Sequence, residues 1–378
     1  MKKSLIAIAI TSALTATSAF AADSNVTVYG DANASFDVVS GGQTTTQVSS
    51  NDSKIGFKGS EDIGGGTSVI WQIEALVNLD SARNGNPSEQ DGAANTFASG
   101  DSFVGLSGDW GTALLGRHDT PYKIANRGYD LFADTVADNR SLMGQAGAGA
   151  FGTGVVNHNA RLDNVAAYIS PSMAGFTIAA AYVAAAENAT VNGDDKASAY
   201  SVAVLYGNKD IGLNVSAAYQ TVKIGTAPNT TGLTVLDALP DGSKATAYSL
   251  GASYTIAGFT VVGEVERETS GGPIGDVLKQ TNWTIGGKYA FTDSDAVKLA
   301  YTKAGDADSL SDTSANLISV GYDHNLSKRT SVYALYTRLK NDDNVGYALG
   351  YSDATSAGVF ASDKSSLSAF SLGIKHSF

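Results

Sequence analysis

Cysteine is absent from this 378-residue chain, and proline occurs only six times. Without cysteine there is neither a disulfide bridge nor thiol chemistry, so an exported chain of this size must gain its stability by another route. Long apolar runs are also missing. After residue 21 no segment approaches the roughly 20 apolar residues that a membrane-spanning helix requires. A transmembrane barrel remains open, because each of its spanning strands is only half apolar.

A surplus of basic residues is missing as well. The formal net charge is −12, and binding to nucleic-acid phosphates needs a basic surface, so no nucleic-acid partner is expected. The four histidines lie far apart, without the spacing of metal ligands, and no nucleophile-elbow or phosphate-binding glycine motif precedes a helix. We therefore expect no enzyme activity, no cofactor and no metal. His324 next to a serine could suggest an outer-membrane lipase, but its place near a short turn favours an interface role.

The N-terminus has the features of a secretory signal peptide. Two lysines precede a short apolar run from Leu5 to Ala13, and an A-x-A cleavage pattern ends at Ala21. We expect residues 1–21 to be removed and residues 22–378 to form one domain. The removed segment carries two lysines and no acid, so the net charge changes from −12 to −14.

The rest of the chain alternates apolar and polar residues, which is typical of strands with two different faces. Lys54-Ile-Gly-Phe-Lys58 and Phe370-Ser-Leu-Gly-Ile-Lys375 are examples. Sixteen segments qualify: about 26–36, 54–60, 67–78, 101–107, 111–117, 164–170, 176–183, 198–206, 211–220, 245–256, 259–268, 281–291, 296–304, 315–325, 330–339 and 366–378.

The connections between these segments alternate strictly between short and long. Tight turns are expected at 61–66, 108–110, 171–175, 207–210, 257–258, 292–295 and 326–329. Long polar loops are expected at about 37–53, 79–100, 118–163, 184–197, 221–244, 269–280, 305–314 and 340–365. An outer-membrane barrel has short periplasmic turns on one rim and longer loops on the other. The sequence therefore predicts an all-β protein, a 16-stranded antiparallel up-and-down transmembrane β-barrel with both termini on the short-turn rim.

Aromatic residues gather at the ends of the predicted strands. Two aromatic belts are expected where a barrel meets the two membrane boundaries. The preference of tyrosine for strands explains the number of these residues but not their clustering. Near short turns or a terminus lie Tyr29, Trp110, Tyr168, Phe176, Tyr206, Tyr254, Phe259, Tyr289, Phe291, Tyr322 and Phe378, and at the opposite ends lie Tyr182, Tyr219, Tyr301 and Tyr336.

The same alternation predicts which side chains face the lumen. If Ile55, Phe57, Trp71 and Ile73 face lipid, their neighbours face inward, because a charge at the bilayer midplane costs roughly 2–4 kcal/mol. A glutamate stripe on one strand is expected to rise along the lumen toward the outer mouth. The inward residues are Lys54, Lys58, Gln72 and Glu74, then Lys288, Lys298 and Lys375, and the stripe Glu264, Glu266 and Glu268.

Several motifs, in order along the whole mature chain, resemble those of the Gram-negative general porins. They are Val26-Thr-Val-Tyr-Gly30, Ser53-Lys-Ile-Gly-Phe-Lys-Gly-Ser-Glu-Asp-Ile-Gly-Gly-Gly66, Trp110-Gly-Thr-Ala-Leu-Leu-Gly-Arg117, Arg161-Leu-Asp-Asn164, the Pro171–Phe176 turn, Leu326-Ser-Lys-Arg-Thr330 and Leu372-Gly-Ile-Lys-His-Ser-Phe378. Lys54 stands where the family often has arginine, and Ser172-Met173 replaces a more usual Glu-Phe.

This resemblance implies a homotrimer in the outer membrane of a Gram-negative bacterium, with the third external loop folded into the lumen. It also implies that Phe378 is recognised by the barrel-assembly machinery. Arg117 and Arg161, at the two ends of that loop, are implied to lie near the narrowest point.

The third loop, residues 118–163, carries charges of both signs. Composition alone fits a solvated external loop equally well, and the resemblance favours the inward fold. An inward loop would place Asp130 and Asp134 against Lys54, Lys58, Arg117 and Arg161 and set up a transverse field. The balance is close, so weak ion selectivity is expected, with a lean toward cations from the Glu264–Glu268 stripe and the acidic loops.

Together these features predict a water-filled outer-membrane pore, through which ions and small hydrophilic solutes diffuse passively. The constriction is assigned to Lys54, Lys58, Glu74, Arg117, Asp130, Asp134, Arg161, Glu264 and Glu266. A substrate-selective channel, an adhesin and a barrel-based enzyme are the alternatives.

Overall fold

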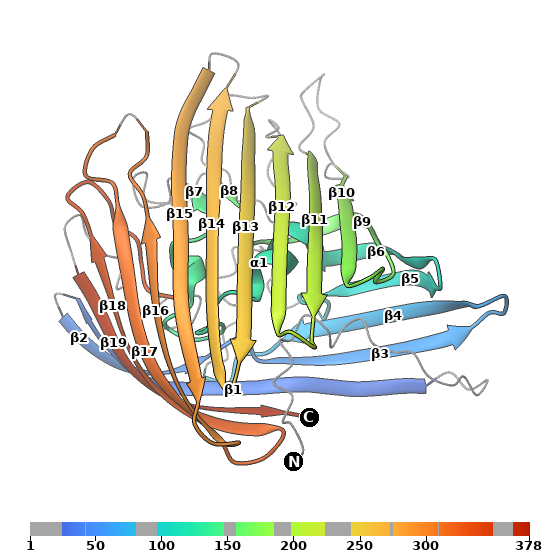
Figure 1. The fold of residues 1–378 in the computed structure, drawn as a ribbon, viewed down its shortest axis with the longest axis horizontal. Helices are drawn as coiled ribbons and strands as arrows, with labels where there is room; N and C mark the ends of the chain where they lie inside the picture. The colour runs from blue at the N-terminus through green and yellow to red at the C-terminus, as the bar shows by residue number, and fades with distance from the viewer. Residues whose placement is uncertain are drawn as a thin grey trace.

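The computed structural model describes residues 25–41, 43–80, 97–146, 156–184, 198–223, 243–272, 275–308, 310–350 and 366–378. The predicted signal peptide lies outside these ranges. The described strands pair with their neighbours around a ring that closes between the first and last strands, where Asp31 is opposite Ser377 (Figure 1). Strands β2 and β3 both pair with β1 and form one interrupted strand, since the chain turns at Asp52 with φ 55°. The result is the predicted closed, 16-stranded antiparallel barrel.

The strands vary widely in length, which bears on the function below. They are β1 (Asn25–Gly41), β2 (Gln43–Ser50), β3 (Lys54–Asp62), β4 (Thr67–Leu76), β5 (Ser102–Gly108), β6 (Gly111–Asp119), β9 (Arg161–Ile169), β10 (Phe176–Val183), β11 (Ser198–Asn208), β12 (Leu213–Lys223), β13 (Lys244–Ile256), β14 (Phe259–Gly272), β15 (Gly275–Ala290), β16 (Asp295–Ala304), β17 (Ala315–Asn325), β18 (Thr330–Asn341) and β19 (Ser366–Ser377). Within the described ranges, no helix has the length and apolar character to cross a membrane.

Both chain ends lie on the rim of short turns. Asn25 is opposite Ser60, next to the tight turn after β3, and Phe378 exchanges backbone hydrogen bonds of 3.1 and 3.0 Å with Gly30. The seven predicted tight turns all separate paired strands, including 171–175 between β9 and β10. The predicted topology is therefore confirmed.

Two of the predicted long loops are mostly strand. β1 continues to Gly41 and pairs with β2, so residues 37–53 are largely an extended hairpin. Likewise β14 reaches Gly272 and β15 begins at Gly275 within the predicted loop 269–280. Alternation with apolar residues reports contact with lipid, whereas backbone pairing can continue beyond the membrane, where that alternation is not required. The sequence pattern therefore underestimated these strands.

The outer face of the barrel is apolar, as the alternation predicted. Ile73, Leu372 and Trp283 are exposed on it, whereas Glu74 on the opposite face of β4 is 3% exposed. Ring pairs form the two belts: Trp110–Tyr168, Phe176–Tyr206 and Phe259–Tyr289 near the short turns, and Tyr182–Tyr200, Tyr219–Tyr248 and Trp283–Tyr301 at the opposite strand ends.

Tyr29 does not belong to the belt in which the sequence placed it. Its hydroxyl donates to Glu74 at 3.1 Å, and the ammonium of Lys58 lies 4.9 Å from its ring centre. Both partners face the lumen. Val26 and Val28 point outward and are exposed. Because side chains alternate between the two faces of a strand, the rule that placed the charged residues in the lumen also places the Tyr29 ring there.

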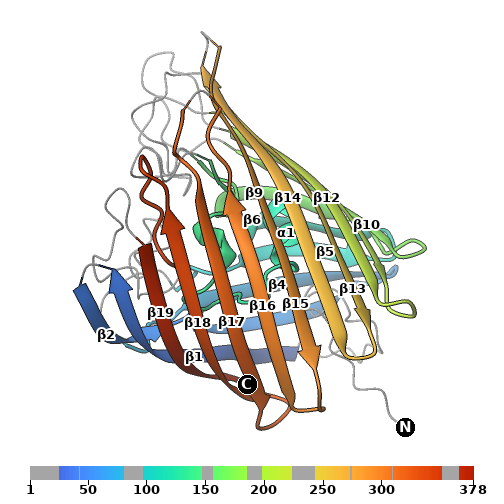
Figure 2. The same cartoon turned by 60° about the vertical axis from the view of Figure 1, so that its left-hand side comes forward.

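Part of the lumen is filled by the third loop. Phe132, Val136 and Leu142 from this loop pack with Leu317 and Leu339 of the wall in the largest apolar cluster. The loop and its short helix lie within the ring of strands in both views (Figures 1 and 2). The inward fold expected from the resemblance is confirmed.

Candidate functional site: a charged constriction

The third loop begins with a helix that its own sequence defines. Thr120 is the N-cap of α1 (Pro121–Arg127), its hydroxyl accepts from the backbone N–H of Lys123 at 3.3 Å, and Pro121 occupies the first turn. A capping threonine followed by proline is a strong start signal for a helix. The chain then continues through η2 (Asn139–Ser141) and a small hairpin of β7 (Gln145–Ala146) and β8 (Val156–Asn157) before β9 begins.

Hydrogen bonds fasten this loop to the wall along most of its course. The hydroxyl of Ser216 donates to the carbonyl of Ala125 at 3.1 Å, and the hydroxyl of Ser249 donates to the amide oxygen of Asn126 at 2.7 Å. Further along, the side-chain amide of Asn33 on β1 donates to the carbonyl of Asp134 at 3.0 Å. The loop thus crosses the barrel from β12 and β13 to β1.

Two wall glycines let the rings of the loop lie directly on the backbone. A Cβ at Gly251 would lie 2.1 Å from the ring of Tyr129, and one at Gly321 would lie 2.8 Å from that of Phe132. Any larger residue at Gly251 would displace Tyr129. This close approach adds dispersion contacts to the hydrogen bonds and narrows the remaining passage.

The glutamate stripe on β14 lies beneath the loop. Glu264, Glu266 and Glu268 are 5, 1 and 0% exposed, and Glu266 accepts from the Tyr122 hydroxyl at 3.0 Å and the Gly144 amide at 2.6 Å. The expectation that this stripe lines the open channel was wrong. Alternation correctly assigned the three glutamates to the lumen side of the wall. Nothing in the sequence of β14 indicated that the third loop would cover them.

On the opposite wall, the predicted basic residues come together with carboxylates. Lys54 lies 3.6 Å from Glu74, and Arg161 lies 2.8 Å from Asp101 and 3.0 Å from Asp119. Arg117 is 2.7 Å from Asp163. These residues come from β3, β4, β6 and β9 and from the residue that precedes β5.

The loop presents its own ion-pair network toward this wall. Arg127 bonds Asp134 and lies 2.9 Å from Asp138, while Arg140 lies 2.8 Å from Asp138. Asp134 is also 3.9 Å from Lys375 on β19, and its charge acts on Lys54. Of the two predicted loop carboxylates, Asp134 faces the passage, whereas the side chain of Asp130 is only 3% exposed.

Burial affects these loop carboxylates differently. Burial and the neighbouring charge of Asp138 raise the pKa of Asp130 to about 7. Burial also opposes the ionisation of Asp138, but Arg127 and Arg140 outweigh it and hold its pKa below the usual range. Asp130 instead accepts from the backbone N–H groups of Phe132 and Asn139 at 2.8 and 3.0 Å, so its main role is to fix the loop.

The sequence reasoning missed Asp101 and Asp163, which complete the arginine pairs. Asp163 lies two residues after Arg161 on the same face of β9, so alternation applied to that strand could have found it. The position of Asp101 just before a short strand gave a weaker signal. Both residues pair with arginines that the sequence analysis had set against Asp130 and Asp134 of the loop.

The four histidines lie on or next to different strands, β6, β8, β17 and β19. Within the described ranges, no set of three His, Asp or Glu side chains has the geometry of a metal site. His158 is fully buried beneath Tyr122, and burial lowers its pKa to about 3, so it stays neutral at physiological pH. His324 bonds the carboxylate of Asp295 at 2.8 Å on the short-turn rim.

A closed barrel with an apolar outer face, aromatic belts and an inward loop that leaves a charged passage defines an outer-membrane pore. The family model of the Gram-negative porins matches residues 7–344. The chain belongs to this family and is an outer-membrane porin, a channel for ions and small hydrophilic solutes.

Named relatives agree with this assignment. The chain is 30% identical to outer membrane porin protein 32 of Delftia acidovorans, with complete coverage of both chains. It is 28% identical to the major outer membrane protein P.IB of Neisseria gonorrhoeae over 60% of this chain and 59% of the relative. Its fold is similar to that of the anion-selective porin from Comamonas acidovorans, with a TM-score of 0.74, 24% identity and coverage of 94% and 100%.

Proposed function

We propose that solutes pass this porin through a narrow passage between the network of Arg127 and Asp134 on the loop and the wall of Lys54, Arg117 and Arg161. The observation that carries this is the fastening of the third loop to β12, β13 and β1. On the other wall Lys54, Lys58 and Asp163 stay accessible, whereas Arg117 and Arg161 are 9 and 5% exposed. Transport needs no cofactor or energy source, because the pore only supplies a wet path across the hydrocarbon. A catalytic role has no support from the site.

The selectivity of this passage is weak and leans toward anions. Glu264 and Glu266 are covered and Asp130 is buried, so the acids from which the sequence suggested a cation lean do not meet the passing ion. Glu74, Asp101, Asp119 and Asp163 are each paired with a base. Lys58 and Lys375 are more exposed and add positive charge near the passage. A similar fold occurs in a porin described as anion-selective, which is consistent with this lean.

Reconstitution into a planar bilayer tests the function directly. Stepwise ohmic conductance with a reversal potential shifted slightly toward the anion equilibrium potential is the expected result. Saturable block of this ion conductance by one sugar or amino acid, and not by others, would favour a substrate-selective channel instead. Silence together with ester hydrolysis would favour an enzyme, and silence together with binding to host cells would favour an adhesin.

We also propose that the protein is a homotrimer whose low wall faces its neighbours. β5 has only seven residues, which at about 3.4 Å each and a tilt of about 40° rise roughly 18 Å. The apolar band of an outer-membrane barrel is about 25 Å tall. Strand β5 is thus too short for contact with lipid alone, and protein from another copy covers this side.

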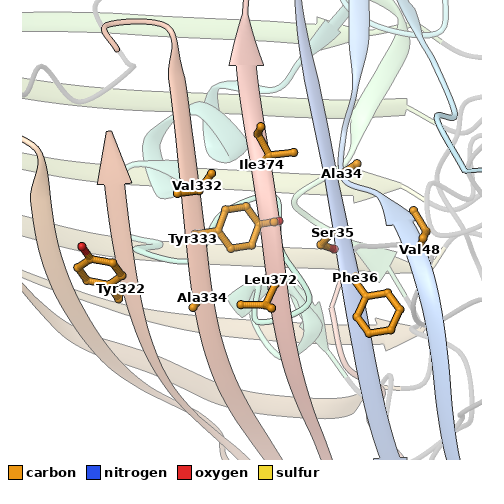
Figure 3. A pocket seen from close by; sticks show the side chains of 11 residues that line it. Ala34, Ser35, Phe36, Val48, Tyr322, Val332, Tyr333, Ala334, Leu372 and Ile374 are labelled. Carbon is orange, nitrogen blue, oxygen red and sulfur yellow. The ribbon is translucent and has the colours of Figure 1, made fainter. Parts of the chain in front are cut away.

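An apolar groove lies further around the wall, three strands from β5 at its β1 edge (Figure 3). Ala34, Phe36, Val48, Ala334 and Leu372 line it on β1, β2, β18 and β19, and its volume is about 520 Å³. Because the chain has no cysteine, a single Ala334→Cys substitution reports whether another copy covers this groove. In detergent solution a maleimide should react with it more slowly in the assembled protein than with Leu250→Cys on the outer face of β13. Equal reaction rates at both positions would contradict the interface.

We also propose roles in export and assembly for residues 1–21 and for Phe378. The proposal is that residues 1–21 direct export and are removed, so that residues 22–378 form the barrel domain. Phe378 then acts as the signal read by the barrel-assembly machinery. Deleting Phe378 should reduce the amount of folded barrel in the outer membrane while leaving export to the periplasm intact.

A further inference from the structure

The wall of the lumen carries an apolar patch on β4, β5 and β6, between the constriction and the short turns. On β5, Val104 is 53% exposed on the outer face of the barrel, so the alternate positions Phe103 and Gly105 point inward. The register partners of Gly105 are Ile70 on β4 and Leu114 on β6, and they share its face of the sheet. Phe103, Ile70 and Leu114 thus form the apolar patch, on strands that lie side by side (Figure 1).

Gly105 gives the apolar patch a hollow at its centre. A Cβ at this position would lie 2.5 Å from the carbonyl oxygen of Ala113 and 3.0 Å from the Cβ of Leu114, so no side chain fits there. Neighbouring strands are about 4.8 Å apart, which puts Ile70 and Leu114 roughly 10 Å from each other across the hollow. A glycine inside a strand often marks a point that a ligand approaches closely.

An apolar surface is unusual at this position, because the interior of an outer-membrane barrel is polar. The rings of the third loop are covered, since Tyr122 and Phe132 are 0 and 1% exposed. Phe103 and Ile70 instead keep part of their surface accessible. The Phe103 ring is held by an edge contact with His118, with 5.3 Å between the ring centres. Covering the apolar patch with an apolar group of a solute is therefore favourable.

A positively charged group stands beside the apolar patch. In the strand register Lys58 on β3 is opposite Gln72 on β4, which in turn is opposite Phe103 on β5. Lys58 is exposed, and its ammonium lies 4.9 Å from the centre of the Tyr29 ring. No carboxylate of the described ranges forms an ion pair with it. A cation and an apolar hollow therefore lie two strands apart on the same face of the wall.

The acids around Lys58 do not neutralise it. The carboxylates of the constriction wall have bases of their own: Glu74 lies 3.6 Å from Lys54, Asp101 lies 2.8 Å from Arg161, and Asp163 lies 2.7 Å from Arg117. Asp62 lies four residues along β3 from Lys58, and Asp31 lies four residues along β1 from Thr27, its register partner. Four residues span roughly 13 Å, beyond the ~8–10 Å over which salt screens charges. The charge of Lys58 is thus available to an anion.

The apolar patch lies on the periplasmic side of the constriction. Lys58 is four residues from Lys54 toward the tight turn at 61–66. At a strand tilt of about 40° this separation is roughly 10 Å along the barrel axis. The short turns of an outer-membrane barrel face the periplasm, so a solute from outside reaches the apolar patch after the constriction.

We propose that Lys58 and the apolar patch bind small aromatic carboxylates, such as benzoate. The ammonium of Lys58 binds the carboxylate, and the ring of the solute lies over Gly105 against Phe103 and Ile70. The site rests on the proposed pore function, because it lies in the same lumen as the constriction. It delays solutes of this class on their way through the pore and does not exclude others.

Bilayer recordings of the chloride current at neutral pH test the site with three probes. Benzoate carries both the charge and the ring, acetate carries only the charge, and benzamide carries only the ring. Benzoate should block the current saturably. Acetate and benzamide should need about fivefold higher concentrations for the same block, because each lacks one of the two interactions, a unit charge at about 4 Å in water or an aromatic pair. Equal block by benzoate and either of the other two would overturn the proposal.

Phe103→Leu is the variant of choice, because it keeps an apolar side chain and removes the ring. It should raise the half-blocking benzoate concentration about two- to tenfold, the range expected for one aromatic pair. Phe103→Tyr should keep the wild-type value. Phe57→Leu, on the outer face of β3, is the matched control and should leave the block unchanged. An unchanged half-blocking concentration in Phe103→Leu, or an equal change in Phe57→Leu, would refute the site.

A chloride current in Phe103→Leu shows that this variant has folded. If it does not fold, Lys58→Gln provides the same test. The half-blocking concentration of benzoate should then rise about fivefold, the effect of one unit charge at about 4 Å in water, while that of benzamide should not change. An equal rise for both probes would contradict the contact between Lys58 and the carboxylate.

Calorimetric titration of benzoate into the detergent-solubilised barrel distinguishes failure of the site from failure of the pore function. With protein-free micelles as the blank, heat of binding that weakens in Phe103→Leu supports the site even if no current is recorded. A conducting channel without this heat overturns the site and leaves the pore function standing.

Discussion

The wall beneath the third loop and the wall that faces it carry charges at the same alternating spacing but have different environments. On β14, Glu264 and Glu266 are covered by the loop, and Glu266 binds it directly. Across the passage, Lys54 pairs with Glu74 and takes part in the open, charged wall. Alternation therefore fixes which face a side chain occupies, and long-range packing decides whether an ion ever meets it.

The largest effect should come from removing an anchor of the covered wall. Tyr122 is fully buried and its hydroxyl bonds Glu266, so Tyr122→Ala should cost about 3–5 kcal/mol of stability and release the loop. We expect higher and noisier single-channel conductance and a lower temperature of unfolding on heated gels.

Tyr29→Ala on the open wall is the matched control. Its ring is only half-buried, against Lys58 and Glu74, so a stability loss of about 1 kcal/mol is expected for its hydrogen bond without loop release. Equal conductance noise in both variants would show that Tyr122 does not hold the loop.

Charge on the open wall should set the ion preference. Neutralising Lys54 and Lys58 together should shift the anion-to-cation permeability ratio toward cations by about fivefold, as expected for a total of roughly 1 kcal/mol from two charges that each lie about 8 Å from the ion path in water. Neutralising Glu264 and Glu266 on the covered wall should shift it by less than twofold, since the loop separates them from the passage. Reversal potentials under a salt gradient decide, and a larger shift from the glutamates would reverse the assignment of the two walls.

The two loop carboxylates offer a finer contrast. Asp134 faces the passage, so Asp134→Asn should shift selectivity toward anions by about two- to threefold at neutral pH, less than the double lysine variant. Asp130→Asn should change it less, because Asp130 is buried and its pKa lies near 7. If the two variants behave alike, the loop does not present Asp134 to the channel.

The smallest effect should appear with pH. The folded pKa of Asp130 is raised to about 7, so the folded loop binds more protons than the unfolded one between the ordinary range near 4 and 7. Stability of the loop should therefore fall as pH rises through that window and level off above it. Anion preference should increase slightly as pH falls from about 7.5 to 5.5. Both trends should vanish in Asp130→Asn, and their persistence would assign them to another group.

The sequence predicted the barrel well because its repeat is local. Alternation in Lys54–Lys58 and Phe370–Lys375 depends only on which side of the wall is apolar, and it also placed Lys288, Lys298 and Lys375 inside. Alternation assigned Lys54 and Lys58 to the lumen side in the same way, and the resemblance added Arg117 and Arg161 to the predicted constriction. What escaped prediction depends on contacts between segments far apart in the chain, such as Tyr122 with Glu266 and Arg161 with Asp101.

The crossing of the lumen by the third loop also has a mechanical consequence. A thin cylindrical shell resists bending along its axis but is easily flattened into an oval. Here the loop is bonded to Ser216 on β12 and through Asp134 to Asn33 on β1, strands that lie half a circumference apart. It therefore works as a strut that ties opposite sides together and keeps the bore round. Lateral pressure from a crowded or stretched membrane should change the width of the passage less than it would in an unbraced barrel.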